Sequence, residues 1–208
     1  MAGKSPEEVV TAATQVFFRY GFKRTTMGDL AEAAHMSRPA LYLVFPSKEE
    51  LFTAVIARLL AASLAEIRAG VARLATPLEQ LVLAFDVWSV RPFELVLSSP
   101  DARDLYESSY VFASDVMTRS ADAFVAIVAG VLEPLVRAQA KVGLSSVQLA
   151  RMLASAIPGF KTVAKTREHF REMIDGMLTV TLASLAGADE HHPPRKSQAR
   201  KAKKTRRG

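Results

Sequence analysis

The sequence predicts an all-α fold, and three observations support this prediction. Hydrophobic residues make up 50% of the 208 residues, while the ten Gly and ten Pro are few, so helix-favouring Leu, Ala, Glu and Arg dominate. Ser or Thr followed three residues later by Glu or Asp recurs along the chain, which is typical of capped helix starts. No segment alternates apolar and polar residues with the period of two that strands favour.

The first fifty residues predict three short helices and a fourth that leads away from them. Each begins at a Ser or Thr that can cap it and continues with apolar residues at helical spacing. The predicted helices cover about residues 6–21, 27–34, 37–45 and 48–70. Only a turn at His35 and Met36 separates the second from the third, and Pro39 is tolerated because first-turn N–H groups have no intrahelical partner. Two short helices joined in this way are typical of a helix-turn-helix.

The rest of the chain predicts a larger helical domain. Caps and breaks place further helices at about 76–88, 93–97, 102–136, 145–165 and 166–185. Arg91-Pro92 interrupts the pattern, and Pro158-Gly159 is expected to kink or loosen its helix. The predicted domains are a helix-turn-helix domain over 1–50, a ligand-binding and dimerisation domain over 51–187, and a tail over 188–208.

The net charge of +6 lies entirely in the tail. Residues 189–208 contain eight Lys and Arg against Asp189 and Glu190, whereas basic and acidic residues cancel in the rest of the chain. Because this segment has almost no apolar residues, we expect it to be disordered. Two interpretations stay open: a non-specific nucleic-acid arm that raises affinity and its salt dependence, or a solvating tail without a role.

Composition and motifs argue against several classes of function. No cysteine is present, which fits a reducing cytosol, and no apolar run approaches the ~18 residues that span a bilayer. No phosphate loop, nucleophile motif or metal-ligand spacing occurs. His169 beside Glu168 and Glu172 fits an exposed helix surface better than a metal site. We therefore expect a cytoplasmic protein that is not an enzyme and has no cofactor, metal or membrane partner.

The third predicted helix is the candidate reader of DNA. In a helix-turn-helix, the second of the paired helices enters the major groove. Arg38 is able to make a bidentate contact to guanine, while Leu41 and Phe45 are expected to face the core. Phosphate contacts are expected from Tyr42 and from residues at helix N-termini. The candidate DNA-binding residues are Thr26, Ser37, Arg38, Pro39, Ala40, Tyr42, Leu43 and Lys48.

The stretch from Thr25 to Leu51, TTMGDLAEAAHMSRPALYLVFPSKEEL, closely resembles the DNA-binding segment of TetR-type transcriptional regulators. Aromatic, glycine and threonine spacing upstream also matches, so the resemblance covers about residues 5–52. It implies a homodimeric repressor whose C-terminal helical domain binds a small effector and dimerises through its last two helices. The resemblance therefore implies that the protein binds DNA and that the effector causes the protein to release it.

The sequence departs from the usual family pattern at two places. The family usually has Gly where His35 stands, because that corner commonly takes a positive φ, which His tolerates at some cost. It usually has His or a second aromatic residue around Leu43 and Val44. We therefore expect DNA affinity to depend more on Arg38 and the candidate phosphate contacts.

Aromatic residues of the second domain form a candidate effector pocket, with ordinary core packing as the alternative for each. Few charged residues interrupt these faces, so the expected effector is largely apolar or aromatic. The pocket candidates are Phe85, Trp88, Phe93, Tyr106, Tyr110, Phe112, Met117 and Phe124.

The last two predicted helices have apolar faces broad enough to form a dimer interface as a four-helix bundle. A two-fold dimer would place its reading helices ~34 Å apart, or a multiple of this, on a palindromic operator. The candidate interface residues are Leu149, Leu153, Ile157, Phe170, Ile174, Met177, Leu178 and Leu185.

The sequence thus predicts a DNA-binding regulator, a homodimeric repressor of double-stranded operator DNA that a small-molecule effector releases. The alternative is an architectural DNA-binding protein without an effector, in which the aromatic residues are all core and the basic tail supplies most of the affinity. A helical enzyme or carrier has no supporting residues.

Overall fold

The computed structural model describes residues 4–139 and 143–187, and within these ranges every regular element is helical. The all-α prediction is confirmed, whereas the predicted tail over 188–208 lies outside the described residues. The elements are α1 (Pro6–Arg24), α2 (Met27–Ala33), α3 (Arg38–Val44), α4 (Lys48–Val71), α5 (Pro77–Phe85), the π-helical turn η1 (Asp86–Val90), α6 (Arg91–Ser98), α7 (Pro100–Phe112), α8 (Ser114–Ala138), α9 (Ser146–Val163) and α10 (Arg167–Ala186).

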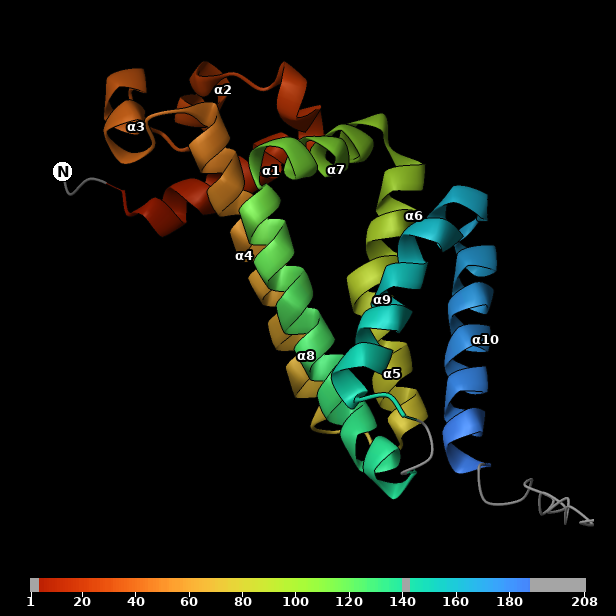
Figure 1. Cartoon of the computed structure of the whole chain (residues 1–208). Coiled ribbons are helices and arrows are strands. Elements are labelled where there is room, and N and C mark those ends of the chain that lie inside the picture. Colours follow the sequence, from red (N-terminus) through yellow and green to blue (C-terminus); the bar gives the residue numbers. More distant parts are fainter. Residues whose placement is uncertain (1–3, 140–142, 188–208) are drawn as a thin grey trace, which may run out of the picture.

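The N-terminal domain consists of α1, α2, α3 and the first turns of α4, and it forms one end of the molecule (Figure 1). Phe17, Leu30 and Leu41 are fully buried in its core, one from each of the first three helices. Phe52 of α4 packs against Phe17, with ring centroids 5.2 Å apart. The long helix α4 therefore closes this core before it continues into the second domain.

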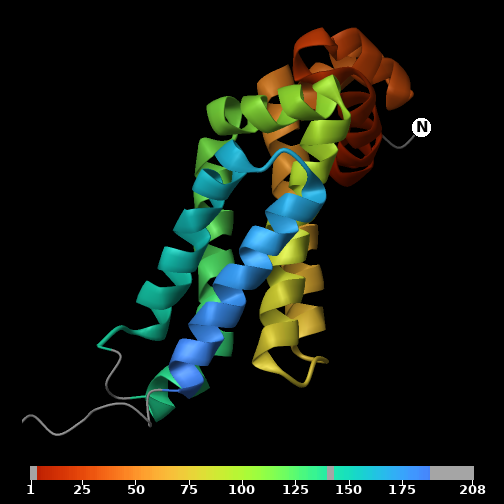
Figure 2. The same cartoon turned by 90° about the vertical axis from the view of Figure 1, so that its right-hand side faces the viewer.

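The second domain is a bundle in which α4 and α8 run side by side away from the N-terminal domain (Figure 1). α8 also packs against α9, which in turn lies beside α10, and Figure 2 shows α9 and α10 together on the face turned to the viewer. Phe85, Phe124 and Phe170 are fully buried in the core of this bundle. The two cores meet along α4, between Ile56 and Leu64, so α4 continues through the predicted boundary at residue 50.

Two predicted breaks take a different form in the structure. Arg91-Pro92 does not end the helical path, because the preceding turn widens into η1, where the Arg91 N–H donates to the Asp86 carbonyl. This wider turn accommodates the missing N–H and the ring of Pro92, which then sits in the first turn of α6. Pro158 likewise lies inside α9, which the structure assigns as one helix through Val163.

The predicted helix over 102–136 is wrong in one respect, because it is two helices that meet at Ala113. Ala113 has non-helical backbone angles, φ −124° and ψ 26°, and its side chain is buried in the N-terminal core. α7 packs across α1, whereas α8 packs along α4 and α9. Packing against different partners sets the break, since nothing in the local sequence pattern requires it.

The end of α1 is joined to α7. Gly21 has φ 72° and ψ 177°, so the helix is interrupted there, as its glycine predicts, and one further turn follows to Arg24. A Cβ at position 21 would lie 2.7 Å from a carboxylate oxygen of Asp104. That carboxylate accepts a hydrogen bond of 2.8 Å from the Lys23 N–H. The glycine therefore allows α7 to approach the backbone of α1 closely.

Candidate functional site

The turn before α3 has the predicted strained geometry. His35 has φ 50°, and among the described residues it is the non-glycine residue with a positive φ. The His35 N–H donates to the Glu32 carbonyl at 2.9 Å, and the Met36 N–H donates to the Ala31 carbonyl at 2.8 Å. These bonds end α2 in the manner of a Schellman motif. The turn aims the next helix outward from the domain.

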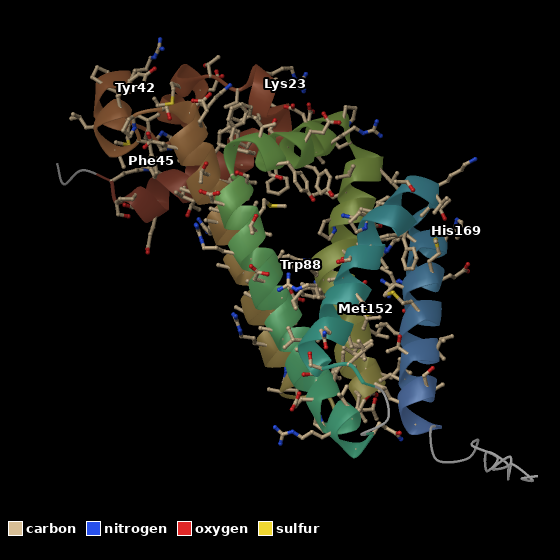
Figure 3. All side chains as sticks on the ribbon, in the orientation of Figure 1. Lys23, Tyr42, Phe45, Trp88, Met152 and His169 are labelled. Atoms are coloured by element: carbon tan, nitrogen blue, oxygen red, sulfur yellow. The ribbon has the colours of Figure 1, made fainter. Side chains whose placement is uncertain are left out.

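α3 presents one end and one face to the surface. The Ser37 hydroxyl accepts a hydrogen bond of 3.3 Å from the Ala40 N–H, which caps the helix as predicted. Arg38 and Pro39 are exposed, and within the described chain the Arg38 guanidinium makes no hydrogen bond or ion pair. Figure 3 shows Tyr42 on this outer helix.

Some apolar residues of α3 pack into the core, and others are exposed to solvent. Leu41 is fully buried and Phe45 packs against the N-terminal core, as predicted. Leu43, in contrast, is 89% exposed, and Tyr42 is 43% exposed. Leu43 therefore extends into solvent at the outer end of α3.

Thr26 caps α2, but its polar groups are already occupied. Its hydroxyl and its backbone N–H both donate to the Asp29 carboxylate, at 2.7 and 2.8 Å. The side-chain and backbone hydrogen bonds from Thr26 lower the pKa of Asp29. A negative charge therefore accompanies this helix N-terminus, so the predicted phosphate contact by the Thr26 hydroxyl competes with Asp29.

The ammonium of Lys48, a predicted phosphate contact, is engaged within the domain. Its Nζ donates to the carbonyls of Phe22 and Thr25, at 2.9 and 3.0 Å, and lies 4.2 Å from the centroid of the Phe22 ring. The carbonyls that end α1 attract a cation, because they lack intrahelical partners and lie at the negative end of the helix dipole. Lys48 thus ties α4 to the end of α1.

The candidate effector residues do not form one pocket. Phe85, Phe93 and Phe124 are core residues, and Trp88 stacks on Phe124 with ring centroids 4.9 Å apart. Figure 3 shows Trp88 between the α4–α8 pair and the helices on the other side of the bundle. Met117 instead packs against the N-terminal core, and the Phe112 ring lies 4.6 Å from that of Phe22. The alternative of core packing therefore holds for most of these residues.

Tyr106 and Tyr110 are the exceptions, because they join a third residue that the sequence analysis missed. Their hydroxyl oxygens are 2.9 Å apart, and Lys161 of α9 donates to the Tyr106 oxygen at 3.2 Å. A single Lys in an amphipathic helix has no sequence signal that sets it apart. Only the approach of the end of α9 to α7 reveals the cluster.

The predicted dimer residues are also corrected. Leu153, Ile157, Phe170, Ile174, Leu178 and Leu185 are buried in the core of a single chain, while Leu149 and Met177 are partly buried against it. The six buried side chains make α9 and α10 part of the bundle, whereas Leu149 and Met177 keep some exposed surface. Among the polar residues exposed on the two helices there are also exposed small and apolar ones, namely Met152, Gly159, Val163, Gly176, Val180 and Ala183.

Residues 9–55 match a family model described as bacterial regulatory proteins of the tetR family. This N-terminal segment is similar to the TetR family. A YfiR regulator of Bacillus subtilis, described as an uncharacterized HTH-type transcriptional regulator, is 45% identical over 53 residues, 26% of each chain. The HTH-type transcriptional regulator TtgR of Pseudomonas putida is 36% identical over 55 residues, again 26% of each chain. The sequence match therefore spans about a quarter of these curated TetR-type relatives.

Solved structures extend the similarity in fold to both domains. A transcriptional regulator from Cytophaga hutchinsonii has a TM-score of 0.68 at 22% identity, with 84% of this chain and 96% of that chain covered. A TetR-family transcriptional regulator from Pectobacterium atrosepticum has a TM-score of 0.66 at 18% identity, with 86% and 93% covered. The helical second domain thus follows the TetR-type domain in the same arrangement as in these proteins.

No helix in the described part of the chain is both long enough and apolar enough to cross a membrane. The same residues contain no group of three or more His, Asp or Glu side chains that could hold a metal ion.

Proposed function

We propose that this protein is a transcriptional regulator, a homodimeric repressor that reads operator DNA with α3 and responds to a small molecule in its second domain. The observation that carries the proposal is the outer end of α3, where Arg38, Tyr42 and Leu43 are exposed on a TetR-type domain. The second domain supports a regulatory role because it is joined to α1 through α7.

Each exposed group of α3 has a distinct role in this proposal. Arg38 offers the planar donor pair that binds the O6 and N7 atoms of guanine. Leu43 offers an aliphatic surface that fits the methyl group of thymine, and the Tyr42 hydroxyl can donate to a phosphate. Ser37 caps the reading helix, and Lys48 ties α4 to the end of α1.

A second copy of the chain is proposed to dock on the exposed faces of α9 and α10. These helices lie side by side on one face of the bundle (Figure 2). Small residues such as Gly159 and Gly176 allow helices to approach closely, and a Cβ at either position would contact no described residue within 4 Å. The resulting four-helix bundle about a two-fold axis would place two copies of α3 on the half-sites of a palindrome.

Related folds support a ligand-responsive second domain. A regulator from Saccharomonospora viridis with a TM-score of 0.60 at 18% identity was solved in complex with choline. A protein from Escherichia coli that is 37% identical over 49 residues is described as a probable operon repressor. Release of DNA by a ligand requires only that the ligand favour the conformation with lower operator affinity, with a coupling of about 1–3 kcal/mol.

Selection of bound DNA from a random pool, followed by binding measurements on the recovered site, tests this function. Arg38→Met is expected to weaken binding to that site by about 1–3 kcal/mol and to relax the preference at one guanine in each half-site. The control is Arg119→Met, since Arg119 is exposed on α8 and makes no hydrogen bond or ion pair in the described chain. Equal losses on every DNA sequence would rule out base reading by Arg38, and recovery of no preferred sequence would overturn the proposed function.

A further inference from the structure

A cationic side chain and two phenols meet between α7 and α9. Lys161 Nζ lies 3.2 Å from the Tyr106 hydroxyl and 4.9 Å from the centroid of its ring. The Tyr106 and Tyr110 hydroxyls are 2.9 Å apart, and their rings meet edge to face with centroids 5.1 Å apart. Lys161 and Tyr106 are partly buried, while Tyr110 is 54% exposed. The cluster is thus recessed but open on the side of Tyr110.

The cluster has more hydrogen-bond donors than acceptors. A lysine ammonium has three N–H donors and each tyrosine hydroxyl has one O–H donor. Two of these five donors are used within the cluster, one from Lys161 to Tyr106 and one between the two hydroxyls. Whichever tyrosine donates to the other, the remaining phenolic hydrogen and two ammonium hydrogens have no acceptor in the cluster. Such a surplus favours a ligand that supplies acceptor atoms.

The cluster also lacks an acidic counter-charge in the described chain. The three carboxylates of α7 are directed to the end of α1, where Asp104 and Glu107 pair with Lys23 and Asp101 pairs with Arg24. Lys161 forms no ion pair with any described Asp or Glu. A partly buried cation without a partner is costly, because burial removes hydration without replacing it. Consistent with this cost, burial lowers the pKa of Lys161.

The Tyr110 phenol remains a hydrogen-bond donor over the neutral pH range. Burial, followed by the hydrogen bond with Tyr106, raises the pKa of Tyr110 to about 12. Its hydroxyl is therefore protonated and can donate to an acceptor on the open side of the cluster. A neutral phenol beside a cation can bind an anion with two oxygens, because the phenol donates to one oxygen and the cation donates to the other.

We propose that Lys161, Tyr106 and Tyr110 bind the carboxylate group of a small organic acid. The ammonium neutralises the carboxylate and the phenolic O–H groups donate to its oxygens. This assignment adds a carboxylate to the largely apolar or aromatic effector that the sequence predicts. Its regulatory consequence rests on the proposed function, whereas binding of the acid does not.

Matched acids and amides test the charge requirement directly. Calorimetric titration of the full-length protein with octanoate and benzoate, and with octanamide and benzamide, compares ligands that differ only in the charged group. We expect each bound acid to bind at least about tenfold more tightly than its amide, as a charge-assisted hydrogen bond implies. Equal affinity for acid and amide, or no binding of either acid at about 1 mM, would overturn the proposal.

Two variants assign the preference to the cluster. Lys161→Met keeps the aliphatic stem and is expected to abolish the preference for the acid, while Tyr110→Phe reduces it several-fold. Lys165→Met is the matched control, because Lys165 is exposed close by and forms no ion pair in the described chain. A preference for the acid that survives Lys161→Met would refute the assignment. Thermal unfolding of each variant verifies that loss of binding is not loss of fold.

A separate assay distinguishes this proposal from the proposed function. Operator affinity is measured with and without the acid that binds, using the site recovered by DNA selection. Binding of the acid without an effect on operator affinity supports the carboxylate site and contradicts its role as the effector site. Loss of operator preference in the DNA selection, together with a charge-dependent acid complex, would overturn the regulatory function and leave the carboxylate site intact.

Discussion

His35 shows how a single residue can oppose the local backbone and still serve the fold. Its φ of 50° lies where most L-residues are strained, and glycine adopts it without steric cost. The hydrogen bonds that end α2 nonetheless hold the turn in place. The strain at His35 therefore lowers the stability of the fold but leaves the direction of α3 unchanged.

We expect His35→Gly to stabilise the protein by up to about 1 kcal/mol, because the strain is removed while the turn is kept. Urea unfolding measures the change, and DNA affinity should be unaltered. The same substitution at His169, which has helical geometry in the first turn of α10, should destabilise instead. A lower midpoint for His35→Gly would mean that the imidazole makes a stabilising contact that outweighs the strain.

Lys48 is the second residue whose role depends on its exact surroundings. Replacement by Met removes the ammonium from two carbonyls that end α1 and leaves the aliphatic stem over Phe22. We expect a loss of about 1–3 kcal/mol in the free energy of unfolding, as for hydrogen bonds to charged groups. Lys165→Met should change little. An unchanged stability together with a lower salt dependence of DNA binding would restore Lys48 as a phosphate ligand.

At the scale of elements, α7 has two faces with different chemistry. Its acidic face binds the end of α1 through Asp104 and Asp101, and its phenolic face meets Lys161 of α9. One helix therefore contacts both the N-terminal domain and the proposed ligand site. This arrangement offers a physical connection between ligand and DNA, because a shift of α7 would change the contacts that hold α1.

The contact of Asp104 with α1 should make stability depend on pH. Burial by itself would raise the pKa of Asp104, but hydrogen bonds from the Lys23 backbone and side chain outweigh it, so the pKa is lowered. Its stabilising effect is therefore present above the unfolded-state pKa of about 3.9 and is lost as pH falls through the lower folded-state value. Asp104→Asn should cost about 1–2 kcal/mol at neutral pH and progressively less in acid.

Urea unfolding of both proteins from neutral pH to about pH 3 measures this difference. The control is Glu172→Gln, which removes an exposed carboxylate that makes no hydrogen bond or ion pair in the described chain. A difference between Asp104→Asn and the unmodified protein that stays constant down to pH 3 would contradict a role for the Asp104 charge.

At the scale of the whole molecule, the bundle leaves one face of α9 and α10 uncovered by the other described residues. Large apolar residues of both helices point into the core, whereas Val180 is 67% exposed and Met152 is 58% exposed. A face of small and apolar residues on paired helices suits association with an identical face about a two-fold axis. The spacing of the two copies of α3 then depends on this contact.

Val180→Arg should convert the proposed dimer into a monomer, because two guanidinium groups would be brought close to the two-fold axis without counter-charges. Sedimentation equilibrium measures the assembly, and affinity for a palindromic site should fall because the half-sites are then bound independently. Val111→Arg is the control, since Val111 is also exposed but lies on α7. A dimer of unchanged affinity in Val180→Arg would place the interface elsewhere.

Much of the fold could be predicted because its signals are local. Caps such as Thr26 with Asp29 and Ser37 on the Ala40 N–H set where helices begin, and apolar spacing determines which side of each helix is buried. The break at Ala113 and the π-helical turn η1 could not be predicted, because they follow from the partners against which the adjoining helices pack. The exposure of the outer end of α3 could be predicted from the same local signals as the helix itself, namely its cap and the spacing of its apolar residues.

The sequence by itself determined the all-helical class, the helix-turn-helix and its outward Arg38, because helix caps and periodic apolar residues act over a few positions. The tertiary structure decided which groups the long side chains contact. It turned Lys48 inward to the end of α1, buried most of the predicted interface residues in the core, and brought Lys161 to Tyr106. These contacts join segments far apart in the chain, so their chemistry depends on distances that only packing sets.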